Sequence, residues 1–338
     1  MKNGKISTPI KYLINGVLIF ALWFIVNSLI TDGAISRYYT RMIIKAGIFV
    51  IAAVSLNLTC GFLGHLPLGH AGFMAIGAYT TALITKNLNL GGEFLTFLIA
   101  LIAGGLVAAV FGVIIGLPAL RLKGDYLAII TLAFGEMIRV VILNLKFTGG
   151  ALGLKQIPRY TNFTWVFALC VITIFVSYAL INSKHGRAII SIRENEIAAE
   201  SCGVNTTYYK TMTFTIAAFF AGISGGLYAC YIATIAPGDF GFMKSIEILV
   251  MVVLGGMGSI VGSVLSATVL TVLPELLRAF DTYRMIVYSL LLIVVMIFKP
   301  SGLMGRYELS LGDGLDALFA KIRNKVGAKT PAEKGDDK

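Results

Sequence analysis

The stretch that decides the fold is residues 94–120, FLTFLIALIAGGLVAAVFGVIIGLPAL, which contains no Asp, Glu, Lys or Arg. About 20 apolar residues are enough for one helix to cross the hydrocarbon core of a membrane. A transmembrane β-strand would alternate apolar and polar residues, and this run does not alternate. The stretch therefore predicts a membrane-spanning α-helix.

Similar charge-free runs recur along the chain, and only 13% of its 338 residues are charged. That is about half the charged fraction of a typical soluble domain. The predicted fold class is an all-α polytopic membrane protein with about 8–10 transmembrane helices, some of them glycine-broken or re-entrant. The expected spans are residues 12–30, 42–59, 66–84, 94–117, 126–143, 163–182, 211–233 and 284–299. The stretch 246–273 is one tilted helix, two short crossings or a re-entrant hairpin.

The remaining charged residues suggest the domain organisation. Residues 1–305 are expected to form the transmembrane domain, with one long charged loop at 183–210. The tail, 306–338, carries one apolar stripe at helical spacing and ends in a stretch expected to be disordered. This amphipathic tail packs on its own protein or lies on an anionic membrane surface. Lys and Arg divide almost evenly between the two sides, so charge alone does not set the orientation.

The net charge of +11 is typical of several classes of protein. In a membrane protein a surplus of Lys and Arg reflects loop topology and anionic lipid, so we expect lipid contact and no nucleic acid. The four cysteines have neither Cys-x-x-Cys nor Cys/His spacing, which predicts no metal site and no disulfide framework.

Glycine marks the expected packing and pathway regions. Gly104, Ala108, Gly112 and Gly116 repeat every four residues, a pattern that lets helices approach closely. Residues 61–79, GFLGHLPLGHAGFMAIGAY, hold too many glycines for a plain helix in lipid. They form a tight turn between spans or an interrupted helix beside a substrate site. The candidate pathway residues, from this segment and from 254–262, are Gly69, His70, Gly72, Phe73, Gly255, Gly256 and Gly258.

One pair of charges is expected inside a span. Glu136 and Arg139 are three residues apart, so they share a helix face. Intramembrane charges are costly and tend to pair, which favours a structural ion pair over a proton relay.

The loop 183–210 contains a short predicted helix, 193–203, with acidic residues near its start. Gly203 lies where a left-handed C-cap falls. Ala198 and Ala199 would give a small, flat face for a partner. The other interpretation is an ordinary surface helix.

This Ala-Ala-x-x-x-Gly core, with Glu196 upstream, resembles the coupling motif of ABC importer permeases. Other stretches resemble the branched-chain amino acid permeases, the LivM-type subunits of the LivH/LivM family, and the resemblance covers roughly residues 45–305. The matching stretches are 68–79, 124–139, 148–153, 217–222 and 254–259.

The resemblance implies a permease subunit of a bacterial ABC importer in the inner membrane, with both termini cytoplasmic. A second homologous permease, two cytoplasmic ATPases and a periplasmic binding protein would complete it. Glu196, Ala198, Ala199 and Gly203 would contact the ATPase. No phosphate-binding Gly-x-x-x-x-Gly-Lys-Ser/Thr loop occurs here, so ATP and Mg²⁺ would bind the ATPases, and this chain would carry neither a cofactor nor a catalytic residue.

Three alternatives stay open. A permease of the same family could carry urea or short amides. A secondary transporter could use Glu136 for protons. A membrane-embedded enzyme would need polar residues converging at one depth, and few exist here.

Overall fold

A computed structural model describes residues 8–88, 91–122 and 124–277, and individual residues between 283 and 305. The predicted tail 306–338 lies outside the described residues, and the predicted span 284–299 is described only in part. The first helix, α1 (Thr8–Thr31), belongs to one compact unit and the later helices to a second, so α1 is described by itself. It covers the predicted span 12–30.

The second unit is built from helices, which confirms the all-α prediction. Its elements are α2 (Arg37–Asn57), η1 (Leu58–Phe62), α3 (His70–Asn87), α4 (Glu93–Ala119), α5 (Asp125–Asn144), η2 (Lys146–Thr148), η3 (Gly150–Leu152), β1 (Leu154–Lys155), α6 (Phe163–Asn182), α7 (Lys184–Glu194), α8 (Glu196–Ser201), α9 (Thr206–Ile232), β2 (Thr234–Ile235), η4 (Pro237–Phe240), α10 (Phe242–Gly255) and α11 (Ile260–Leu276).

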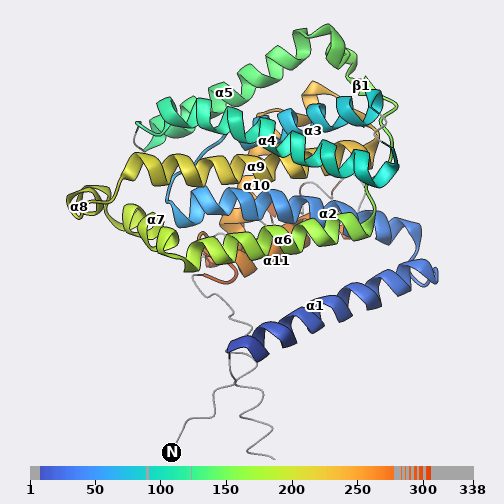
Figure 1. Ribbon diagram of the computed structural model, residues 1–338, viewed down its shortest axis with the longest axis horizontal. Helices are drawn as coiled ribbons and strands as arrows, with labels where there is room; N and C mark the ends of the chain where they lie inside the picture. The colour runs from blue at the N-terminus through green and yellow to red at the C-terminus, as the bar shows by residue number, and fades with distance from the viewer. Residues whose placement is uncertain are drawn as a thin grey trace, which may run out of the picture. The chain divides into compact units, whose positions relative to one another are not determined.

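Five helical segments of the described chain are long and apolar enough to cross a membrane. They are Arg37–Phe62, which joins α2 to η1, and the helices α4, α5, α6 and α9. α2, α3, α4, α6 and α9 run side by side as a bundle (Figure 1). The helix predicted at 66–84 begins at His70, and the residues directly before His70 are not helical.

Three helices, α3, α4 and α9, pack most closely. A Cβ atom placed on Gly77 of α3 would overlap the backbone of Gly222 in α9. A Cβ on Gly112 of α4 would lie 2.7 Å from the side chain of Ala218 in α9. The small-residue repeat of α4 therefore serves helix packing, as predicted. We call α3, α4 and α9 the glycine-packed block.

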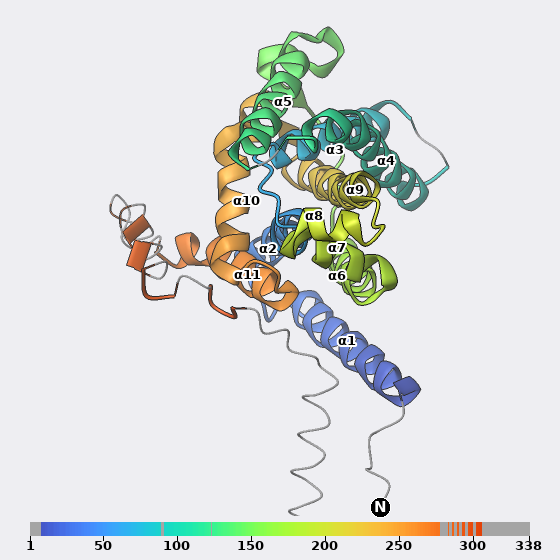
Figure 2. The same cartoon turned by 90° about the vertical axis from the view of Figure 1, so that its left-hand side faces the viewer.

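α10 crosses the bundle instead of joining it. Seen along the bundle, it runs from α5 past α3 and α2 to α11 (Figure 2). It ends at Gly255, and α11 starts at Ile260 after a sharp turn. Of the three alternatives for 246–273, the single tilted helix is therefore excluded, because the glycines break the segment into two helices.

The two ends of the bundle differ. α7 and α8 lie at one end and β1 at the other (Figure 1). β1 pairs antiparallel with β2 through Leu154 and Ile235, a two-residue ladder that closes the end of the bundle. The loop 183–210 thus forms a structured cap at the opposite end.

Candidate functional site

The loop 183–210 folds as two capped helices. The Ser183 side chain accepts hydrogen bonds from the backbone N–H groups of the first turn of α7. The Asn195 side chain accepts one from the Ala198 N–H at the start of α8. Gly203 follows α8 with φ +83°, the left-handed conformation expected there. The helix itself is shorter than predicted, because Asn195 separates it from α7.

The candidate coupling residues face different ways. Ala198 is exposed, whereas Ala199 is only 5% exposed. The two alanines therefore do not form one outward face, and Ile197, 70% exposed, shares the outer surface with Ala198. Glu196 pairs with Lys210 of α9 at 2.7 Å, so α8 is tied to the glycine-packed block.

His65 lies in the non-helical segment before α3. Burial, followed by the nearby Lys210 ammonium, lowers the pKa of His65 below its usual value. Both influences disfavour the protonated imidazole.

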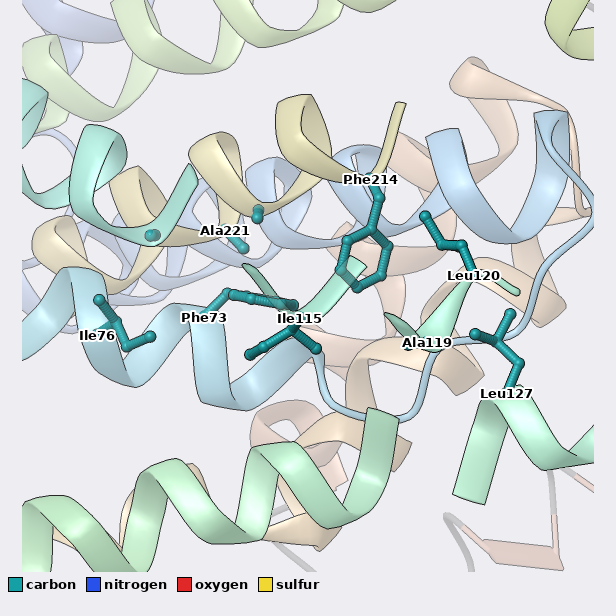
Figure 3. Close-up of a cluster of buried hydrophobic side chains, with 10 residues drawn as sticks. Phe73, Ile76, Ile115, Ala119, Leu120, Leu127, Phe214 and Ala221 are labelled. Atoms are coloured by element: carbon teal, nitrogen blue, oxygen red, sulfur yellow. The ribbon is translucent and has the colours of Figure 1, made fainter. Parts of the chain in front are cut away.

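The candidate pathway residues of the first glycine segment pack inside the protein. A Cβ on Gly69 would overlap the Thr131 carbonyl of α5. His70 is 2% exposed, and its Nε2 lies 2.9 Å from the Ser55 hydroxyl. Phe73 points at Phe214, edge to face, in a buried cluster between α3 and α9 (Figure 3). In this structure these residues hold helices together.

Gly72 likewise lies at a helix crossing, since a Cβ there would be 2.9 Å from Cα of Gly135. The second glycine segment forms the turn between α10 and α11. A Cβ on Gly255 would be 2.5 Å from the Gly262 backbone, and Gly256 and Gly258 have φ +107° and +90°. Glycine is needed at both positions because side chains disfavour that backbone region.

The two glycine segments meet through Asn57, a residue that the sequence analysis did not single out. Asn57 is fully buried at the end of α2. Its Nδ2 donates to the Ser259 carbonyl at 2.9 Å, and its Oδ1 accepts from the Gly258 N–H at 3.0 Å. One amide therefore satisfies two backbone groups of the α10–α11 turn.

The charges of α5 also meet α10. The Arg139 Nε donates to Glu136 Oε2 at 2.6 Å, so the predicted partners are brought together. Glu136 Oε1 accepts from the Phe242 N–H at 2.9 Å, which caps the first turn of α10. Lys244, two residues after Phe242, pairs with Glu247 and lies 4.3 Å above the Phe49 ring. The contacts of Glu136 with Phe242 and of Lys244 with Phe49 join residues far apart in sequence.

Metal chemistry has no support among the described residues, where no group of three or more His, Cys, Asp or Glu side chains could hold an ion.

Comparison with known proteins gives the family. The sequence profile described as "Branched-chain amino acid transport system / permease component" matches residues 38–297. The chain is 39% identical to the permease LivM of Salmonella typhimurium and 38% identical to LivM of Escherichia coli, in both cases over 304 residues. Those alignments cover 79% of this chain and 70% of each relative.

The chain is also similar to LivH, a second type of permease. LivH of Salmonella typhimurium is 26% identical over 291 residues, which cover 77% of this chain and 92% of LivH. No solved structure gives a significant match. The profile covers most of the chain, and helices long enough to span a membrane fill the matched region. The chain therefore belongs to the family of branched-chain amino acid transport permeases.

Proposed function

We propose that this chain is the LivM-type permease subunit of an ABC importer, and that it moves branched-chain amino acids inward by ATP-driven alternating access. The observation that carries the proposal is the family match over residues 38–297, with 39% identity to LivM. Matches to both LivM and LivH indicate a paired, homologous permease subunit. The subunit is a transport component and not itself an enzyme.

The ATPase partners are assigned to the end of the bundle that carries α7 and α8. Supporting this, α8 presents exposed Ile197 and Ala198 on a capped, six-residue helix. A short helix with small and apolar outward residues fits a shallow groove on a partner. On this assignment the loop 183–210 is cytoplasmic, and two ATPases bind ATP and Mg²⁺ below it.

The remaining assignments follow from that orientation. β1, β2 and η4 then face the periplasm, where a secreted binding protein delivers the substrate. The N-terminus and the tail 306–338 are on the cytoplasmic side. The glycine segments 61–79 and 254–262 are assigned to the substrate pathway, whose walls include the partner permease.

Transport by the reconstituted system tests the proposal. The permease pair, the ATPases and the binding protein are placed in proteoliposomes, and uptake of labelled leucine is measured. We expect uptake to need internal ATP, to resist a protonophore, and to be inhibited by isoleucine and valine. If only urea or short amides compete, the substrate is one of these compounds and not a branched-chain amino acid. Uptake driven by a proton gradient without ATP would contradict the ABC mechanism.

The ATPase-contact assignment has its own test. Ala198→Glu places a bulky charge on the outer face of α8 and should abolish ATPase co-purification while leaving the permease folded. Ala151→Glu is the matched control, because Ala151 is also exposed but lies in η3 beside β1 at the other end of the bundle. Equal ATPase recovery with both variants would contradict the assignment.

A further inference from the structure

The two interruptions of the helix bundle are in direct contact. α2 ends in the π-helical turn η1, and the chain stays non-helical until His70. A Cβ on Gly61 of η1 would overlap both the Asn57 side chain and the Gly258 N–H of the α10–α11 turn. The Cys60 sulfur lies 3.7 Å from the Met257 sulfur across the same contact. We call this contact, formed by residues 57–64 and 256–259, the break junction.

A side chain from the loop 183–210 enters the break junction. The Nη1 of Arg193, in the last turn of α7, donates to the Gly61 carbonyl at 2.7 Å. Its aliphatic stem passes Gly64, where a Cβ would be 2.9 Å from Cγ. A Cβ on Gly258 would lie 3.1 Å from the same Nη1. Arg193 therefore occupies space left by a glycine of each interruption.

The hydrogen bond made by Arg193 has a clear physical reason. The carbonyls at a helix end lack partners within the helix, and burial makes an unpaired carbonyl costly. A charged donor gives a stronger hydrogen bond than a neutral one.

Arg193 is covalently close to the proposed ATPase contact. Only Glu194 and Asn195 separate it from α8, and Asn195 is extended, with φ −158°. The Asn195 side chain caps α8, so a shift of α8 must move the end of α7. The same shift would move the Arg193 side chain away from Gly61 or closer to it, because Arg193 lies close to both Gly64 and Gly258.

We propose that Arg193 is a positioning residue that couples the loop 183–210 to the break junction, so that movement of α8 opens or closes both helix interruptions together. This inference rests on the proposed function, since it needs an ATPase acting on α8. A coupling element must differ in its contacts between two states. Here the differing contact is the Arg193–Gly61 hydrogen bond.

The ratio of substrate imported to ATP hydrolysed is the decisive readout, measured on the full complex in proteoliposomes. We expect Arg193→Gln to lower the ratio about tenfold while ATP hydrolysis continues, and Arg193→Lys to restore part of it. Arg187→Gln is the matched control, because Arg187 is exposed on the same helix and its loss changes charge equally. We expect the control to keep the wild-type ratio.

The outcomes separate this inference from the proposed function. A wild-type complex whose uptake does not depend on ATP would refute the proposed function. A coupled wild-type complex with an equally coupled Arg193→Gln variant refutes only the inference. If Arg193→Gln lowers thermal stability but keeps the ratio, Arg193 is a structural clamp and the inference is likewise overturned.

A second measurement keeps Arg193 intact and tests whether the break junction must open during import. It is used if the Arg193 variants do not assemble. Met257→Cys is combined with native Cys60, and exposed Cys202 is replaced by serine. Because the two sulfur atoms lie close together, oxidation with a small membrane-permeant oxidant such as molecular iodine should then join the two interruptions by a disulfide bond. We expect the cross-linked complex to stop importing while still hydrolysing ATP, and normal import by it would overturn the inference. The single variant without Cys60 is the control.

Discussion

Glycine has two different structural roles in two regions of this permease. In the glycine-packed block, Gly77 and Gly222 bring the backbones of α3 and α9 into contact, and the neighbouring side chains are buried and apolar. In the break junction, Gly61 and Gly258 lie beside the polar side chains of Asn57 and Arg193. The same residue type thus makes one region rigid and gives the other a turn that polar groups hold together.

The difference lies in how each region would respond to strain. Close-packed helices lose many small contacts at once when they separate, so the block moves as a unit. The break junction is held by a few hydrogen bonds to backbone groups outside regular helix. Such groups can exchange partners at a smaller cost. The comparison predicts that the block carries folding stability and the junction carries movement.

The largest expected effect is from Gly77→Ala in the block. The added methyl overlaps the Gly222 backbone, so α3 and α9 must separate. We expect a loss of roughly 3 kcal/mol of stability and a several-fold fall in folded protein recovered from the membrane. The control is Gly238→Ala in η4, where a Cβ would meet nothing within 4 Å. Equal recovery of both variants would contradict the packing role.

A smaller effect is expected from Asn57→Leu in the break junction. The leucine keeps the volume but removes the acceptor of the buried Gly258 N–H, at a cost of about 1–3 kcal/mol. We expect thermal unfolding at a lower temperature and a larger loss of import than of stability. Thr59→Val is the control, because that hydroxyl bonds only the Leu56 carbonyl of its own helix. An Asn57→Leu variant that imports normally would contradict a role of the break junction in import.

The smallest effect is expected from Glu136→Gln at the contact between α5 and α10. Both side chains of the ion pair are about a third exposed, so the loss is about 1 kcal/mol. Glu136→Gln combined with Arg139→Gln should be more stable than the single change, because no unpaired charge remains. Denaturation midpoints of both variants measure this. Normal stability with abolished transport in the single variant would instead favour the proton relay.

The sequence was informative where a periodic pattern existed. Charge-free runs located the long helices, and the repeat from Gly104 to Gly116 predicted close packing. Gly203 predicted the left-handed end of α8. Each of these signals is local, because composition over a few helical turns determines it.

The sequence contains no signal that predicts contacts between distant segments. Nothing in an apolar run marks Asn57 as the partner of a turn 201 residues later. The cap from Glu136 to Phe242, 106 residues apart, has no local signal either. The structure buries residues 69–73 between helices, a packing that the glycine motif alone does not reveal, and their role in a pathway stays a prediction. The burial of Ala199 depends on how α8 packs against its neighbours α7 and α9, which spacing within the loop does not reveal.

Hydrogen exchange of the complete transporter, with and without a trapped ATP state, tests the central comparison most directly. Backbone amides of residues 57–69 and 255–262 cover the break junction, and those of 73–85, 100–116 and 217–229 cover the block. We predict that the ATP state changes exchange at the junction about tenfold or more and leaves the block unchanged. Equal changes in both regions, or a change confined to the block, would contradict the account.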